Sequence, residues 1–140
     1  MTHRQPGRAT IDRLRSAAEE AMHRAYAPYS SFRVGAALLG DDGSVVTGCN
    51  VENASYPATI CAERGAVAAA VARGITGFDA LVIVTEATEP TPPCGVCRQV
   101  LVEFAPSLPV VSVAAQGREA TWSLEELLPQ PFVPDSMGRA

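Results

Sequence analysis

The sequence contains no lysine, and its 11 basic residues are arginines spread along the whole chain. The formal net charge of the 140 residues is −4 at pH 7. Proteins that bind DNA or RNA obtain most of their affinity from clustered basic side chains that neutralise phosphates. This composition therefore argues against a polymeric nucleic acid as partner or substrate.

Long apolar runs are also missing, because no stretch approaches the roughly 18 consecutive apolar residues of a membrane-spanning helix. Residues 1–10 hold no apolar segment of the kind found in secretory signals. We therefore expect no membrane association and a cytoplasmic location. With 47% hydrophobic and 19% charged residues, the composition is that of a globular chain. We expect a single domain over residues 1–140, with residues 1–9 as a flexible tail.

Histidine is scarce, and both histidines, His3 and His23, lie far upstream of the cysteine cluster. The four cysteines are Cys49, Cys61, Cys94 and Cys97. In a cytoplasmic chain such a set indicates metal or redox chemistry before disulfide bonds. The cysteines are therefore the first candidates for chemistry in this sequence.

Hydrophobic periodicity and turn residues predict helices and strands in alternation. Helices are expected at 11–26, 61–73, 95–104 and 124–128. Strands are expected at 32–39, 44–48, 81–85 and 110–114, with a fifth short strand ending near Trp122. This order predicts an α/β fold, a three-layer α/β/α sandwich around a mixed five-stranded sheet.

Capping and breaking residues set the expected ends of these helices. Thr10 is a candidate N-cap for the first helix, and Pro28 is expected to end it. Ser123 is expected to cap the last helix. The second helix is apolar on every face over 66–72, so we expect it to be buried in the core or between subunits.

Three cysteines and one carboxylate form the strongest chemical feature. Cys61-Ala62-Glu63 opens the second helix, and Cys94-Gly95-Val96-Cys97 opens the third. Thiolates are good zinc ligands, and a Cys-x-x-Cys pair at a helix start lets both sulfurs reach one ion. Three protein ligands leave the fourth zinc position open for water, which is typical of a catalytic site.

Charged neighbours complete this predicted centre. Glu63 follows Cys61 by two residues, so its carboxylate can reach the water without binding the metal. Three thiolates on Zn²⁺ leave a net charge of −1, which two helix N-termini partly offset. Arg64 and Arg98 are nearby cations that we expect to hydrogen-bond the thiolates.

Two other kinds of protein share parts of this pattern. A thioredoxin-type redox pair would use Cys94 and Cys97 but leave Cys61 and Glu63 without a role. A structural zinc module would close the site with Cys49 as fourth ligand. Cys49 alone is typical of a small buried apolar residue.

Segments around these motifs resemble the small homotetrameric zinc-dependent cytidine deaminases. The three-cysteine zinc site with a glutamate outside the ligand set is a known variant of the wider zinc deaminase group. The resemblance covers about residues 25–132. The segments that carry it are 29–38, 48–56 (GCNVENASY), 59–64 (TICAER), 93–101 (PCGVCRQVL) and 126–129 with Phe132.

The resemblance implies a role for each matching residue. Cys61, Cys94 and Cys97 would hold one zinc ion per subunit, with Arg64 as partner of the ligand sulfurs. Glu63 would carry protons between the zinc-activated water and the cytosine. The implied substrate contacts are Phe32 against the pyrimidine, Asn50 and Glu52 on the ribose, Ala62 as a further contact, and Ala54, Tyr56 and Phe132 completing sites across subunit boundaries of a homotetramer.

The implied reaction is hydrolysis of cytidine and deoxycytidine to uridine and deoxyuridine with release of ammonia. Glu52 beside the ribose would accept hydrogen bonds from hydroxyls and repel phosphate, so nucleosides are expected over nucleotides. A deaminase of the same fold acting on another cytosine nucleoside, such as blasticidin S, is the nearest alternative. A polynucleotide deaminase is disfavoured by the net charge and by the absence of a basic, aromatic channel.

Overall fold

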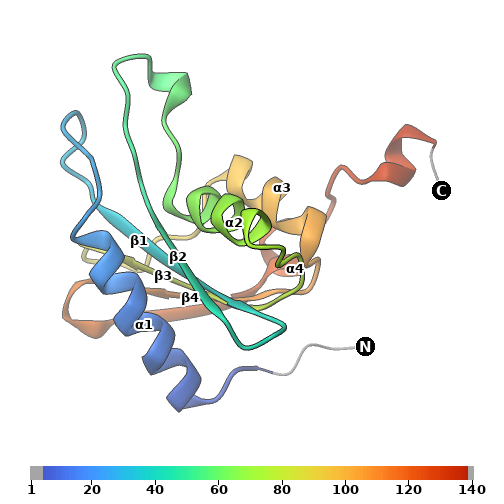
Figure 1. Cartoon of the computed structure of the whole chain (residues 1–140), viewed down its shortest axis with the longest axis horizontal. Helices are drawn as coiled ribbons and strands as arrows, with labels where there is room; N and C mark the ends of the chain where they lie inside the picture. The colour runs from blue at the N-terminus through green and yellow to red at the C-terminus, as the bar shows by residue number, and fades with distance from the viewer. Residues whose placement is uncertain (1–4, 139–140) are drawn as a thin grey trace.

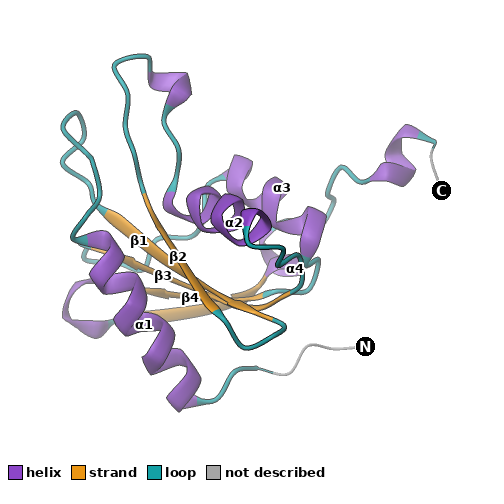
Figure 2. Ribbon diagram, in the orientation of Figure 1, coloured by secondary structure: helices purple, strands orange, loops and turns teal. Residues whose placement is uncertain are grey.

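The structure is a computed structural model that describes residues 5–138. Its helices and strands alternate as the sequence predicts (Figure 2). The α-helices are α1 (Arg8–Met22), α2 (Ala62–Ala72), α3 (Gly95–Phe104) and α4 (Leu124–Leu127). The strands are β1 (Val34–Gly40), β2 (Val45–Cys49), β3 (Phe78–Thr85), β4 (Pro109–Val113) and β5 (Glu119–Ser123). Short 3-10 helices are η1 (Tyr56–Ala58), η2 (Ala115–Gly117) and η3 (Pro134–Met137).

One five-stranded sheet forms the centre of the fold, with the strand order β2-β1-β3-β4-β5. Strand β1 pairs antiparallel with both β2 and β3, whereas β3 and β4 run parallel. The connection between these parallel strands contains α3, as a parallel pair requires. Strand β5 closes the edge antiparallel to β4. The predicted mixed sheet is therefore confirmed.

Helices cover both faces of this sheet (Figure 1). Alternate strand residues point to opposite faces, so neighbours such as Val82 and Ile83 belong to different cores. Ile83 packs in the larger core beneath α2 and α3, and Val82 packs in the smaller core beneath α1. The sandwich is therefore three layers deep. Among the described residues, none of the helices has both the length and the apolar character of a membrane span.

The first helix differs from its predicted bounds at both ends. It begins at Arg8 with Gly7 as N-cap, so the Thr10 cap is wrong and residues 8 and 9 do not belong to a tail. It ends at Met22, well before Pro28. Tyr26 forms a β-bridge with Val51, and this pairing takes the backbone out of the helix. The remainder of the predicted tail includes residues 1–4, which lie outside the described part.

Close packing of α2 on β2 depends on a glycine. A Cβ atom at Gly48 would lie 2.4 Å from the carbonyl oxygen of Ala62 and 2.5 Å from the amide nitrogen of Ala66. Only the missing side chain allows the helix backbone to approach the strand this closely. This contact fixes where α2 begins on the sheet, and therefore where Cys61 and Glu63 lie.

Candidate metal centre and adjoining cavities

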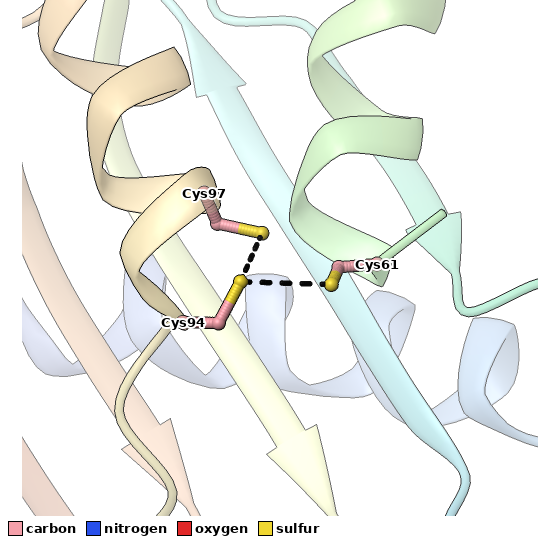
Figure 3. Close-up of side chains that lie close together, drawn as sticks. All are labelled: Cys61, Cys94 and Cys97. Carbon is pink, nitrogen blue, oxygen red and sulfur yellow. Dashed lines mark hydrogen bonds between the residues drawn. The ribbon is translucent and has the colours of Figure 1, made fainter. Parts of the chain in front are cut away.

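The three predicted zinc ligands meet where two helices begin. Cys61 is the N-cap of α2, Cys94 is the N-cap of α3, and Cys97 lies in the first turn of α3. Figure 3 shows the three thiols turned toward one another between the two helix starts. The two helices are brought side by side by their common packing on one face of the sheet. Residues 33 positions apart thus form one cluster.

The separations of the sulfurs fit a tetrahedral metal ion. The Sγ atom of Cys94 lies 3.7 Å from that of Cys61 and 3.3 Å from that of Cys97. All three sulfurs lie within 4.8 Å of one another. Ligand sulfurs on a tetrahedral zinc ion, with Zn–S bonds of about 2.3 Å, lie about 3.8 Å apart. The donor set therefore suits Zn²⁺, and Cys49 lies outside this group, which excludes the closed four-cysteine site.

Local charge already favours a thiolate at Cys61. The neighbouring Cys97 thiol and the Arg64 guanidinium lower the pKa of Cys61 to about 5. The pKa of Cys97 is raised by its interaction with Cys61 and by burial. Both helix N-termini add positive potential at the sulfurs. A metal cation would displace the thiol protons and hold all three sulfurs as thiolates.

Arg64 contacts this cluster, whereas Arg98 does not. The Nη2 atom of Arg64 lies 3.7 Å from Cys61 Sγ and donates to the carbonyl of Thr59 at 3.1 Å. Arg98 instead donates to the carbonyls of Pro93 and Leu127 at 2.8 and 2.7 Å. The expectation that Arg98 bonds a thiolate is therefore wrong. Its guanidinium ties the loop before α3 to the end of α4.

Glu63 is buried beside the sulfurs, with 5% of its surface exposed. Burial raises the pKa of Glu63 to about 7, and the neighbouring Cys61 charge adds to this effect. A carboxyl group with such a pKa can both accept and release a proton near neutral pH. Glu63 also lines a cavity, so its proton can be exchanged with a bound molecule.

This cavity, of about 180 Å³, opens directly beside the three-cysteine cluster. Its lining combines the predicted metal-binding, proton-transfer and substrate-binding residues. They come from the start of α2, from the segment just before β1, from the position just after β2 and from the loop before α3. The lining includes Phe32, Asn50, Cys61, Ala62, Glu63 and Cys94, together with Thr59, Thr91 and Pro92. Phe32 lies just before β1 rather than within it. The cavity therefore combines an apolar wall, a buried carboxyl group and thiol sulfurs.

Asn50 is buried, and its carboxamide hydrogen-bonds the backbone of the segment that leads into β1. The Oδ1 atom accepts a hydrogen bond from the amide of Val34 at 2.9 Å, and Nδ2 donates to the carbonyl of Phe32 at 2.7 Å. One amide hydrogen and one lone pair remain for a ligand, since a carboxamide has two of each. Asn50 thus fixes Phe32 and still faces the cavity.

A second cavity, of about 330 Å³, adjoins the first through the shared residue Thr59. It contains the predicted contacts Glu52 and Tyr56, together with Tyr29, Ser30 and Asn53. The rings of Tyr29 and Tyr56 meet edge to face with centroids 6.0 Å apart. Ala54 and Phe132 line neither cavity of this chain, and both are exposed. Sequence reasoning did not single out Ser30, Thr59 or Thr91, whose residue types are ordinary in loops.

Several known proteins of similar sequence are cytidine deaminases. The family model for the cytidine and deoxycytidylate deaminase zinc-binding region matches residues 9–113. The chain is 41% identical over 131 residues to a cytidine deaminase of Sporosarcina psychrophila, covering 93% of this chain and 96% of the relative. A crystal structure of cytidine deaminase from Burkholderia pseudomallei superimposes with a TM-score of 0.83 at 48% identity, covering 86% of this chain and 98% of that one.

The cytidine deaminase structure from Mycobacterium tuberculosis gives a TM-score of 0.75 at 44% identity, covering 87% and 96% of the two chains. The identity and coverage of these matches far exceed what a shared fold alone requires.

Proposed function

The chain belongs to the cytidine and deoxycytidylate deaminase family, and from this premise we propose how its residues convert cytidine and deoxycytidine to the uridine nucleosides and ammonia. One observation carries the proposal. The buried carboxyl group of Glu63 shares a cavity with the three-cysteine centre, within a pocket walled by Phe32. That arrangement brings together three thiols that can bind a metal, a proton carrier and an apolar wall for a base.

Cys61, Cys94 and Cys97 would hold one zinc ion, which would supply a Lewis acid that activates water for attack on C4 of the cytosine. Glu63 takes the proton from the attacking water and delivers it to N3 of the cytosine. The same carboxylate then passes the second proton of that water, now on the hydroxyl group at C4, to the amino group, which leaves as ammonia when its bond to C4 breaks. Its raised pKa supports both roles, because neither protonation state is strongly disfavoured near neutral pH.

The nucleoside lies across the two cavities in this proposal. The pyrimidine packs against Phe32 and above Ala62, while Asn50 and Glu52 take the ribose hydroxyls. Glu52 stays ionised because hydrogen bonds from Ser30 and its neighbours lower its pKa. A carboxylate at this position favours hydroxyls and repels phosphate. Cytidine is therefore preferred over CMP, and other cytosine nucleosides such as blasticidin S form the second candidate substrate class.

We propose a homotetramer with sites shared between subunits. Several large apolar side chains stay exposed in the single chain, Tyr56 at 70% and Phe132 at 57% among them. On the apolar helix α2, Val71 also stays exposed, although such a helix is expected to be covered on all sides. Exposed apolar surface of this extent is typical of subunit interfaces. Tyr56, Ala54 and Phe132 then contact the substrate bound to a neighbouring subunit.

A cytoplasmic location suits the thiol chemistry of the centre, because a reducing compartment keeps Cys61, Cys94 and Cys97 available for zinc. The proposed partners are small nucleosides and further copies of this chain. The net charge of −4 does not favour nucleic acid.

Ammonia release from cytidine by purified, zinc-loaded protein tests the function directly. Sustained release, with uridine formed in equal amount, is the expected result. A folded, zinc-loaded sample that releases no ammonia from cytidine or deoxycytidine contradicts the proposal. Release from blasticidin S alone would assign the chain to the second substrate class.

A further inference from the structure

The Glu52 carboxylate is held by three donors from one short loop. Its Oε1 atom accepts hydrogen bonds from the amides of Tyr29 at 2.9 Å and Ser30 at 3.1 Å. Its Oε2 atom accepts a hydrogen bond from the Ser30 hydroxyl. Two of the three donors therefore belong to Ser30. The carboxylate keeps free lone pairs, since it has about four acceptor positions.

The Ser30 hydroxyl also bonds the residue that walls the first cavity. Its Oγ atom accepts a hydrogen bond from the amide of Phe32 at 3.0 Å. One hydroxyl group thus joins Glu52, in the second cavity, to Phe32, in the first. Ser31 lies between Ser30 and Phe32 in the sequence. Its φ of 57° lies in the left-handed region that is uncommon for residues other than glycine.

Few other contacts within residues 5–138 fix this loop. Residues 28–32 are all exposed, so no buried apolar side chain anchors them in the core, and the Tyr29 ring meets only the exposed ring of Tyr56. The remaining bonds are the amide of Ser31 to the carbonyl of Ala27 at 3.0 Å and the Asn50 bond to Phe32. An exposed segment in an uncommon backbone conformation keeps its shape only when surrounding bonds determine it. The Ser30 hydroxyl supplies two of those bonds.

We propose that Ser30 is a positioning residue for substrate recognition, whose hydroxyl sets the Glu52 carboxylate and the Phe32 ring at a fixed separation. This inference rests on the proposed function, in which Glu52 takes the ribose and Phe32 takes the pyrimidine. Ser30 does not touch the reacting atoms. Its hydroxyl fixes Glu52 and Phe32 relative to each other, so a nucleoside can contact both with its ribose and its base at the same time.

The test compares two substrates that differ only in the ribose hydroxyls, cytidine and 2′,3′-dideoxycytidine. Ser30→Ala is expected to raise KM for cytidine about tenfold, the size of effect of one hydrogen bond to a charged group. KM for the dideoxynucleoside is expected to change much less, because that substrate offers Glu52 no ring hydroxyl. The kcat values are expected to stay within about twofold of wild type, since Glu63 and the metal centre are unchanged.

Two further variants separate positioning from general damage. Ser31→Ala removes the neighbouring hydroxyl, which makes no hydrogen bond within residues 5–138, and is expected to leave both KM values unchanged. Ser30→Thr keeps a hydroxyl and is expected to restore cytidine KM to within about threefold of wild type. If Ser30→Ala does not fold, Ser30→Cys replaces it, because a thiol is a much weaker donor.

An equal increase in KM for both substrates in Ser30→Ala would mean that the substitution only disturbs the loop, and the inference would be wrong. Unchanged cytidine KM in folded Ser30→Ala would also overturn it. Neither outcome bears on the proposed function, which fails only if the wild-type protein does not deaminate cytidine or deoxycytidine.

Discussion

Glu63 and its neighbours are the individual side chains on which the proposed chemistry depends most. Glu63 is the buried carboxyl group that lines the cavity beside the sulfurs. Arg64, on the same helix turn, is bound to Thr59 and Cys61. We thus propose proton transfer and charge compensation by adjacent residues of α2 with different contacts.

Replacement of Glu63 by glutamine is expected to separate metal binding from catalysis. The amide fills the same space and leaves Cys61, Cys94 and Cys97 intact, so zinc content should remain at one ion per chain. Loss of the proton carrier is expected to lower kcat by about 10²- to 10⁴-fold. Elemental analysis and ammonia release measure the two quantities on one sample. Near-normal kcat in a zinc-loaded variant would show that another group carries the proton.

Recognition of the ribose is expected to be insensitive to mild acid. Hydrogen bonds from Ser30 lower the pKa of Glu52 below its ordinary value of 4.5, so the carboxylate stays ionised as pH falls through the neutral range. The ratio of kcat/KM for cytidine to that for 2′,3′-dideoxycytidine should therefore stay constant from about pH 8 to about pH 5. Taking a ratio cancels pH effects on the metal centre. A decline already between pH 7 and 6 would contradict an ionised Glu52 as the sugar acceptor.

Residue type and spacing predict the three-cysteine cluster far better than they predict the hydrogen bonds of Arg98 and Ser30. Cys61, Cys94 and Cys97 are recognisable because few other patterns place thiols at two helix starts. Arg98 has the same residue type and a similar position to Arg64, but its guanidinium finds two carbonyls that no sequence pattern reveals. The bonds of Ser30 depend on how two loops meet, which is a property of the folded chain alone.

Helix α2 and strand β2 together place the segment that carries the proposed proton carrier Glu63. The helix packs on β1 and β2 through small residues, and its N-terminus carries both Cys61 and Glu63. Periodicity predicts this helix to within one residue of its observed bounds, whereas α1 begins and ends earlier than predicted. The difference arises because Tyr26, which the prediction placed in the first helix, pairs with Val51 in a long-range contact, while α2 is bounded by local caps.

Substitution of Gly48 by alanine is expected to displace α2. The added methyl group would lie 2.4 Å from the Ala62 carbonyl, so the helix must shift. Overpacking of this kind costs about 1–3 kcal/mol of stability. A shift of about 1 Å in the catalytic segment can lower the rate about 10²-fold. Urea unfolding and ammonia release check both effects.

Gly65→Ala is the matched control, because it adds the same methyl group from the opposite side of the contact. There the new Cβ would lie 3.6 Å from its nearest neighbour, an ordinary contact distance. Alanine also favours a helix interior by up to about 1 kcal/mol over glycine. This variant should be as stable as wild type or more so. Equal destabilisation by both substitutions would show that the close approach at Gly48 is not the cause.

The assembled molecule is expected to complete what the single chain leaves open. The C-terminal segment after α4 runs away from the body of the fold (Figure 1), and the carbonyl of its Phe132 is bound by Gln99. The Phe132 ring lines neither cavity of its own chain. An aromatic ring held away from its own site, beside other exposed apolar side chains, suits contact with a second copy. The resemblance alone, and no local pattern, supplies the number of subunits.

Co-expression of two defective chains can test whether sites are shared. Glu63→Gln removes the proton carrier, and Phe132→Ala removes the ring proposed to reach a neighbouring site. If each site takes Glu63 from one subunit and Phe132 from another, random mixing leaves about a quarter of the sites with both residues intact. Mixed tetramers, isolated through two different affinity tags, should then exceed the activity of either variant alone. If both residues serve the same chain's site, no site in the mixture is intact, and activity should stay at the average of the two separate variants.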